Sequence, residues 1–221
     1  MNKLGADLLR WVLFTVAAQA LLMLLAGRID DPMLWAYGLV LSGITLAAIR
    51  TMDPDLLRER RSPAPGGIDR RRGPVISALF LLQLVGGVLD AGRLHWSPAM
   101  PLSARLAGLG VFAAAMALVV RSAAVNRYFS PVVRIQSERG HRLVTAGPYR
   151  LLRHPGYLGM ALAFPASAAA LGSWFALAIA LVSVGLILRR VVLEDRYLRA
   201  NLPGYSEYAE SVRYRLVPGL W

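Results

Sequence analysis

The sequence predicts an all-α protein, a polytopic bundle of about six membrane-spanning helices with both termini in the cytoplasm. Hydrophobic residues make up 56% of its 221 positions and charged residues only 17%, whereas roughly a quarter of a soluble domain is charged. Apolar runs recur along the chain, and each is near the roughly 17–25 residues that cross a bilayer. The runs cover about residues 8–26, 33–49, 75–89, 103–120, 156–171 and 173–188.

The basic residues supply a further observation, because they alternate between the predicted loops. Of the 25 lysines and arginines, 22 fall before the first run or after the second, fourth and sixth. Only Arg28, Arg93 and Arg105 lie on the opposite side. Cytoplasmic loops carry such an excess, so we expect both termini and the basic segments to be cytoplasmic. The net charge of +12 then indicates contact with anionic lipid of the bilayer, and we expect no nucleic-acid partner.

The first half of the chain reads as four spans. The first run lacks a small-residue cleavage site and is too long for a signal-peptide core, so we expect it to stay in place as a span. Asp31 and Pro32, which favour a turn, follow this run. Segment 50–74 is rich in Pro and Gly and predicts a loop on the membrane face, whose charges we interpret as anchors to lipid headgroups.

The last two runs are separated by little more than Leu171, Gly172 and Ser173. So short a link predicts a helical hairpin over 156–188, which returns the chain to the face it left. We therefore expect an N-terminal region 1–125 of four spans. A C-terminal candidate catalytic region 126–221 would hold a polar loop, the hairpin and a cytoplasmic helix.

Residues 136–159 contain the densest polar chemistry of the chain. Pro155 predicts a helix that begins directly after His154, and Pro148 predicts extended backbone at Gly147. The free amides and the dipole at such a helix start suit an anionic group. Two of the three histidines lie in this segment, His141 and His154.

Glu194 and Asp195 are the acidic residues placed just past the last apolar run. Arg190 precedes Glu194 by four positions, which permits an ordinary ion pair along the helix. Alternatively, Glu194 faces the helix start at His154 across the hairpin. Ionisable groups at this depth are candidates for function, and a ligand that satisfies both clusters is a zwitterion or an anion.

Other chemistries have weaker support. The chain has no cysteine, which excludes disulfides and thiolate sites. His141 and His154 lack a metal-binding spacing, so we expect no metal. No serine stands in a nucleophile-elbow pattern.

From about Phe129 to Leu220, the sequence resembles the isoprenylcysteine carboxyl methyltransferase family of integral membrane enzymes. The core of the resemblance is the run Arg153-His154-Pro155 followed by Tyr157 and Gly159, together with the acidic pair at hairpin spacing. The family usually has two glutamates where this chain has Glu194 and Asp195. Further matching positions are Gln136, Glu138, His141, Gly147, Tyr149, Arg190, Leu198, Gly204, Tyr205, Tyr208 and Pro218.

The resemblance implies methyl transfer from S-adenosylmethionine to a lipophilic or amphiphilic acceptor. Candidate acceptors are an isoprenylcysteine-like carboxylate, an isoprenoid acid, a phospholipid amine and a thiol. Arg153, Arg190 and Glu194 are the implied catalytic residues. The positions implied in cofactor contact are Gln136, His141, Gly147, Tyr149, His154, Pro155, Tyr157 and Glu194.

Two other functions compete with this one. A membrane reductase of the sterol-reductase type, with a similar C-terminal hairpin, would bind NADPH. A non-enzymatic lipid-binding protein would need no cofactor. We expect a multi-pass protein of a bacterial inner membrane, with its site facing the cytoplasm.

Overall fold

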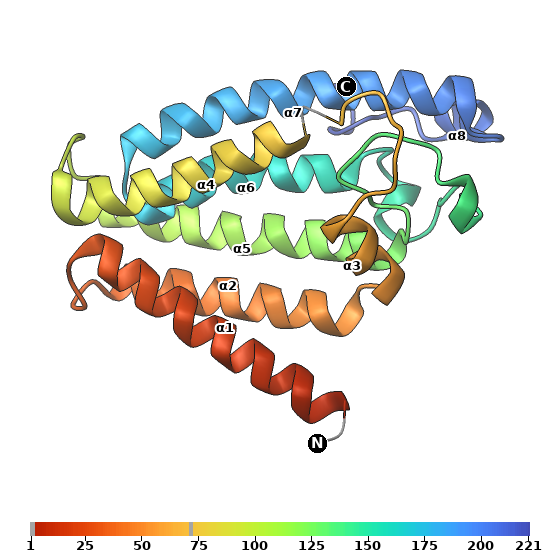
Figure 1. Ribbon diagram of the computed structural model, residues 1–221. Helices are drawn as coiled ribbons and strands as arrows, with labels where there is room; N and C mark the ends of the chain where they lie inside the picture. Colours follow the sequence, from red (N-terminus) through yellow and green to blue (C-terminus); the bar gives the residue numbers. More distant parts are fainter. Residues whose placement is uncertain (1–2, 71–72) are drawn as a thin grey trace.

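The computed structural model describes residues 3–70 and 73–221, and side chains from residue 8 onward (Figure 1). Within these ranges the regular structure is entirely helical, which confirms the predicted fold class. Arg71 and Arg72 of the basic loop lie outside the described residues. The elements are α1 (Lys3–Ala26), α2 (Pro32–Thr51), α3 (Pro54–Arg61), α4 (Gly73–Leu89), η1 (Asp90–Leu94), α5 (Leu102–Val125), η2 (Ser137–Arg139), η3 (Gly147–Arg150), α6 (Pro155–Leu171), α7 (Trp174–Asn201) and α8 (Tyr205–Ser211).

Five of the described helices are long and apolar enough to cross a membrane: α1, α2, α4 with η1, α5 and α7. The remaining predicted span, 156–171, corresponds to α6, which has 17 residues and extends for about 26 Å. By contrast, α7 runs far past its apolar portion. Its 28 residues extend for about 42 Å, so Arg190, Glu194 and Asp195 lie on the same continuous helix as the span.

The bundle is centred on α5, α6 and α7, with α4 beside α7, α2 beside α5 and α1 outermost (Figure 1). Small residues allow the closest approach. A Cβ added at Gly108 of α5 would lie 2.8 Å from the Cβ of Ala169 on α6. One added at Gly159 of α6 would lie 2.7 Å from the carbonyl of Ala115 on α5. Such small-residue contacts are a common basis of helix packing in membranes.

The connections divide between the two ends of the bundle as the sequence predicts (Figure 1). At one end, Arg105 forms a 2.8 Å ion pair with Asp31, and Ser173 donates to Asp90 over 2.5 Å. The predicted α6–α7 hairpin is confirmed, with Gly172 in the left-handed region at φ 84°. At the other end, α3, the 126–154 segment and the chain after α7 converge, and they form the walls of the candidate site.

Candidate functional site

A cavity of about 150 Å³ lies at the convergent end, between the 126–149 segment, α3 and the ends of α4, α6 and α7. Its walls include seven residues that the sequence predicts for the site. They are His141, Tyr149, Arg153, His154, Tyr157, Arg190 and Glu194. Three other predicted residues, Gln136, Gly147 and Pro155, are not part of the cavity wall.

Tyr157 joins the two helices of the hairpin inside this cavity. Its hydroxyl donates to Oε2 of Glu194 over 2.6 Å and accepts from Nε of Arg190 over 2.7 Å. Oε1 of Glu194 makes no hydrogen bond to any described residue. Glu194 is the only carboxylate among the described residues of the cavity wall, so one of its oxygens is free for a ligand.

Arg190 forms its ion pair with Asp69 rather than with Glu194. Nη1 of Arg190 lies 2.9 Å from Oδ2 of Asp69, and Nη2 donates to the carbonyl of Pro131. The short ion pair along α7 that the sequence permits is therefore absent. Asp69, Arg190, Tyr157 and Glu194 instead form one continuous chain of polar contacts from the 50–74 segment into the cavity.

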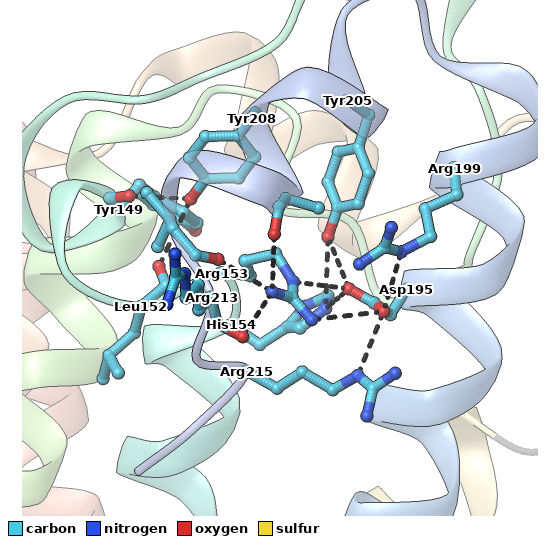
Figure 2. A network of polar contacts seen from close by, with 12 residues as sticks. Tyr149, Leu152, Arg153, His154, Asp195, Arg199, Tyr205, Tyr208, Arg213 and Arg215 are labelled. Atoms are coloured by element: carbon cyan, nitrogen blue, oxygen red, sulfur yellow. Dashed lines mark hydrogen bonds and ion pairs between the residues drawn. The ribbon is translucent and has the colours of Figure 1, made fainter. Parts of the chain in front are cut away.

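Asp195 is not part of the cavity wall and lies at the centre of a cluster of polar contacts (Figure 2). Its side chain is fully buried, at 0% exposure. Nε of Arg153 lies 2.8 Å from Oδ1, Nε of Arg215 lies 3.0 Å from Oδ2, and Nε of Arg199 lies 3.4 Å from Oδ2. The Tyr205 hydroxyl also donates to Oδ1, over 3.0 Å. Glu194 and Asp195 therefore play different parts although they are adjacent in sequence.

The Arg153 guanidinium is committed to this cluster and to the chain after α8. Nη1 donates to the carbonyls of Val212 over 2.7 Å and Arg213 over 2.8 Å, and the Arg153 amide donates to the carbonyl of Tyr214. Arg153 is only 5% exposed. Its position fits a group that holds the wall together, whereas the family resemblance implied a catalytic residue.

His154 occupies the predicted position directly before α6, whose first residue is Pro155. The imidazole is buried at 4% exposure. Its Nε2 lies 3.3 Å from Oδ1 of Asp195 and 3.3 Å from the Tyr205 hydroxyl. The ring thus borders the cavity while the Asp195 cluster fixes its orientation.

His141 contributes a second imidazole from the loop after η2. Its Nδ1 accepts from the Gln136 amide over 3.2 Å, and its ring stacks on Tyr128 with centroids 4.4 Å apart. Burial, with smaller effects of Arg134 and Arg139, lowers the pKa of His141 to about 4. A neutral imidazole that accepts at Nδ1 carries its proton on Nε2, so His141 is a hydrogen-bond donor at neutral pH.

Gln136 and Gly147 lie outside the cavity wall and position residues that belong to it. The side chain of Gln136 is 1% exposed and donates to the carbonyl of Tyr128 over 2.8 Å. Gly147 was predicted to be extended, and this is wrong. It adopts φ +58°, in the left-handed region that glycine tolerates best, and opens the turn that places Tyr149 in the cavity wall.

The sequence analysis missed the contribution of the 50–74 segment. Glu59 pairs with Arg134 over 2.9 Å and accepts from Ser130 over 2.9 Å, while Asp69 accepts from the Val133 amide over 3.0 Å. The only available signal was its density of charge, which we interpreted as headgroup contact. Through Glu59 and Asp69 this segment is attached to the chain that forms the cavity wall.

Comparison with known proteins adds a family assignment to this geometry. The phospholipid methyltransferase family matches residues 103–203. A probable protein-S-isoprenylcysteine O-methyltransferase from Oryza sativa subsp. japonica is 36% identical over 99 residues, covering 42% of this chain and 52% of that protein. Protein-S-isoprenylcysteine O-methyltransferase A from Arabidopsis thaliana is 35% identical over 99 residues, covering 42% and 50%.

A longer match has lower identity. Protein-S-isoprenylcysteine O-methyltransferase B from Arabidopsis thaliana is 26% identical over 144 residues, covering 62% of this chain and 73% of that protein. The chain spans about half the length of the more similar relatives. All these relatives are plant proteins, so they give no support to the expected bacterial membrane. Residues 103–203 match the model of the phospholipid methyltransferase family, and the predicted resemblance to the isoprenylcysteine carboxyl methyltransferase-like membrane proteins is thereby confirmed.

Proposed function

We propose that this protein transfers a methyl group from S-adenosylmethionine to a lipophilic or amphiphilic acceptor in the cavity beside Glu194. The observation that carries the proposal is the hydrogen bond from Tyr157 to Glu194, which leaves one carboxylate oxygen free. A zwitterionic cofactor with an ammonium group and ribose hydroxyls offers the donors that such an oxygen accepts. The family assignment of residues 103–203 supports the same reaction.

The chemistry of the cavity wall fits this cofactor. Tyr128, Phe129, Tyr149 and Tyr157 contribute aromatic rings, and aromatic faces attract cations such as a sulfonium. The Nε2–H group of His141 can donate a hydrogen bond to a nitrogen or oxygen atom of a ligand. When bound, S-adenosylmethionine would supply an electrophilic methyl group at a positively charged sulfur.

The residues of the cavity favour an acceptor that is already deprotonated. Methyl displacement needs chiefly positioning and exclusion of water. A carboxylate needs no general base, whereas an amine or a thiol must lose a proton. His141 has its accepting nitrogen occupied by the Gln136 amide, and we assign the free oxygen of Glu194 to the cofactor. We therefore place a carboxylate first among the candidate acceptors.

An apolar cleft offers a path for the lipid part of such an acceptor. The cleft, of about 120 Å³, lies between α4 and α7 and is lined by Val75, Ile76, Leu186 and Leu193. Ile76 and Arg190 belong to both the cleft and the cavity. An alkyl or prenyl chain in the cleft would therefore have its polar end in the cavity, at the face that the basic residues assign to the cytoplasm.

Binding of S-adenosylmethionine and of NADPH to the detergent-purified protein tests the proposal directly. We expect saturable binding of S-adenosylmethionine and none of NADPH, because the free oxygen of Glu194 accepts from a cationic cofactor and would repel the phosphates of NADPH. Glu194→Gln should weaken S-adenosylmethionine binding by about tenfold, the usual scale for a charged hydrogen bond. Binding of NADPH alone would favour the reductase, and binding of neither would favour a lipid-binding protein.

A further inference from the structure

Helix α3 is held against the cavity by contacts on both sides of Arg60. The adjacent Glu59 is 6% exposed. Its carboxylate accepts hydrogen bonds from Nε and Nη2 of Arg134, over 3.2 and 2.9 Å. Leu56, one turn earlier, is fully buried at 0% exposure. Farther along, the Ile68 amide donates to the carbonyl of Val133 over 3.1 Å. The backbone that carries Arg60 is therefore fixed relative to the cavity.

The Arg60 side chain extends from α3 to the cavity wall. Its Nη1 donates to the carbonyl of Phe129 over 3.1 Å, and its guanidinium carbon lies 5.5 Å from the centre of the Phe129 ring. A guanidinium has five N–H donors in a planar fork. The contact with Phe129 uses one of them, so the others are available for a ligand.

Charge compensation separates Arg60 from three of the four other arginines of the cavity wall. Arg134 pairs with Glu59, Arg153 with Asp195, and Arg190 with Asp69. Among the described residues, no carboxylate lies within ion-pair distance of Arg60. Crowding by the surrounding chain lowers the pKa of Arg60, and the charge of Arg190 lowers it further, although the residue is exposed to solvent and an arginine remains protonated. An anion placed beside Arg60 would offset both effects.

From this arrangement we infer that Arg60 is a specificity-determining residue that binds the anionic oxygen group of the acceptor, a carboxylate or a phosphate. The inference rests on the proposed function for the identity of the reaction. Arg60 lies outside residues 103–203, the region that carries the family domain. The N-terminal half of the chain thereby contributes to acceptor choice, while Glu194 and the aromatic wall serve the cofactor. A planar guanidinium suits this task because it pairs with such groups through two parallel hydrogen bonds.

Binding of matched lipid probes to the full-length protein in detergent tests the inference without requiring turnover. The probes are S-farnesylcysteine blocked at its amine, the corresponding carboxamide, and farnesyl monophosphate. In the wild type, we expect the two anions to bind more tightly than the carboxamide. Arg60→Gln should weaken binding of the anions by about tenfold or more, as truncation of a charged pair does, and that of the carboxamide by less than about twofold.

Arg61→Gln is the matched control, because Arg61, like Arg60, is exposed on the same short helix but does not belong to the cavity wall. It should leave all three affinities unchanged. Arg60→Lys keeps the charge but lacks the planar guanidinium, so its affinities for the anions should lie between those of the wild type and Arg60→Gln. Circular dichroism and gel filtration verify that each variant is folded. A larger effect on the carboxylate than on the phosphate would identify the natural anion as a carboxylate, and the reverse would identify a phosphate.

Two results would overturn the inference: equal affinity of the wild type for the carboxamide and both anions, or equal losses for all three probes in Arg60→Gln. Affinity for S-adenosylmethionine is measured in parallel and should change by less than about twofold in Arg60→Gln, because the assigned contacts concern the acceptor. Failure of the wild type to bind S-adenosylmethionine would contradict the proposed function alone. The probe comparison would still report on Arg60.

Discussion

The hydroxyl of Tyr157 on α6 donates a 2.6 Å hydrogen bond to Glu194 on α7, across the helical hairpin. The same hydroxyl accepts from Arg190, so a single oxygen sets the position of both charged groups. Removal of that oxygen should lower the cofactor affinity and leave the fold intact.

Tyr157→Phe keeps the ring and deletes only the bridge. We expect S-adenosylmethionine affinity to fall by about three- to tenfold, because a lost hydrogen bond costs about 0.7–1.4 kcal/mol. Isothermal calorimetry measures the change. Tyr214→Phe serves as a control, because this tyrosine is exposed and does not belong to the cavity wall. An unchanged affinity in Tyr157→Phe would show that the bridge does not position Glu194 for the ligand.

Asp195→Asn should destabilise the protein strongly, by about 3–5 kcal/mol. Loss of the charge leaves the buried Arg153 without its counterion, and removal of one member of a buried pair has a cost on this scale. Asp30→Asn, at an exposed ion pair with Arg28, should have little effect. Thermal unfolding in detergent compares the two variants. Similar melting temperatures would indicate that the carbonyls around Arg153 suffice to hold it.

The buried imidazole of His141 predicts a dependence of stability on pH. Its folded-state pKa of about 4 is below the ordinary value of 6.5, so the unfolded chain binds more protons between these values. Stability should therefore rise with pH across this window and be lost as pH falls toward 4. In His141→Gln this contribution should disappear, so the difference in melting temperature from the wild type should vary between about pH 4 and 6.5. A constant difference would contradict the shift.

Helix packing can be tested at two glycines of α5. Gly108→Ala should destabilise the bundle, because the new Cβ would lie 2.8 Å from backbone and side-chain atoms of α6. Gly110→Ala, two residues later, adds its Cβ where no atom lies within 4 Å. We expect a lower melting temperature only for the first variant. Its free energy of unfolding should fall by an amount typical of overpacking, about 1–3 kcal/mol. Equal stability of the two would mean that α5 and α6 separate without cost.

The sequence predicted those elements whose start or end is marked by residues of the element itself. The short link at Gly172 specified the α6–α7 hairpin, and Pro155 specified where α6 begins. The sequence predicted helix around Arg190 and Glu194, but not that this helix and the last span form one element. Polar residues replace the apolar run after 188, yet no helix breaker occurs until Pro203. A polar helix that continues past a span leaves no mark in a hydropathy pattern.

The walls of the site could not be predicted in full, because several of their contacts join residues far apart in the sequence. Glu59 and Arg134 are separated by 75 positions, and nothing local to either residue identifies its partner. The same holds for Asp69 and Arg190. The roles of Glu194 and Asp195 were also beyond sequence reasoning, because adjacent helical positions point in directions about 100° apart.

The attachment of the C-terminal segment to Arg153 has a consequence for biosynthesis. The guanidinium and amide of Arg153 bond to carbonyls between Val212 and Tyr214, and Arg215 pairs with Asp195. Until residue 215 has been synthesised, the start of α6 lacks these partners. A nascent chain whose spans are already inserted would therefore be incompetent to bind its ligands, and assembly of the site would be among the last events of folding.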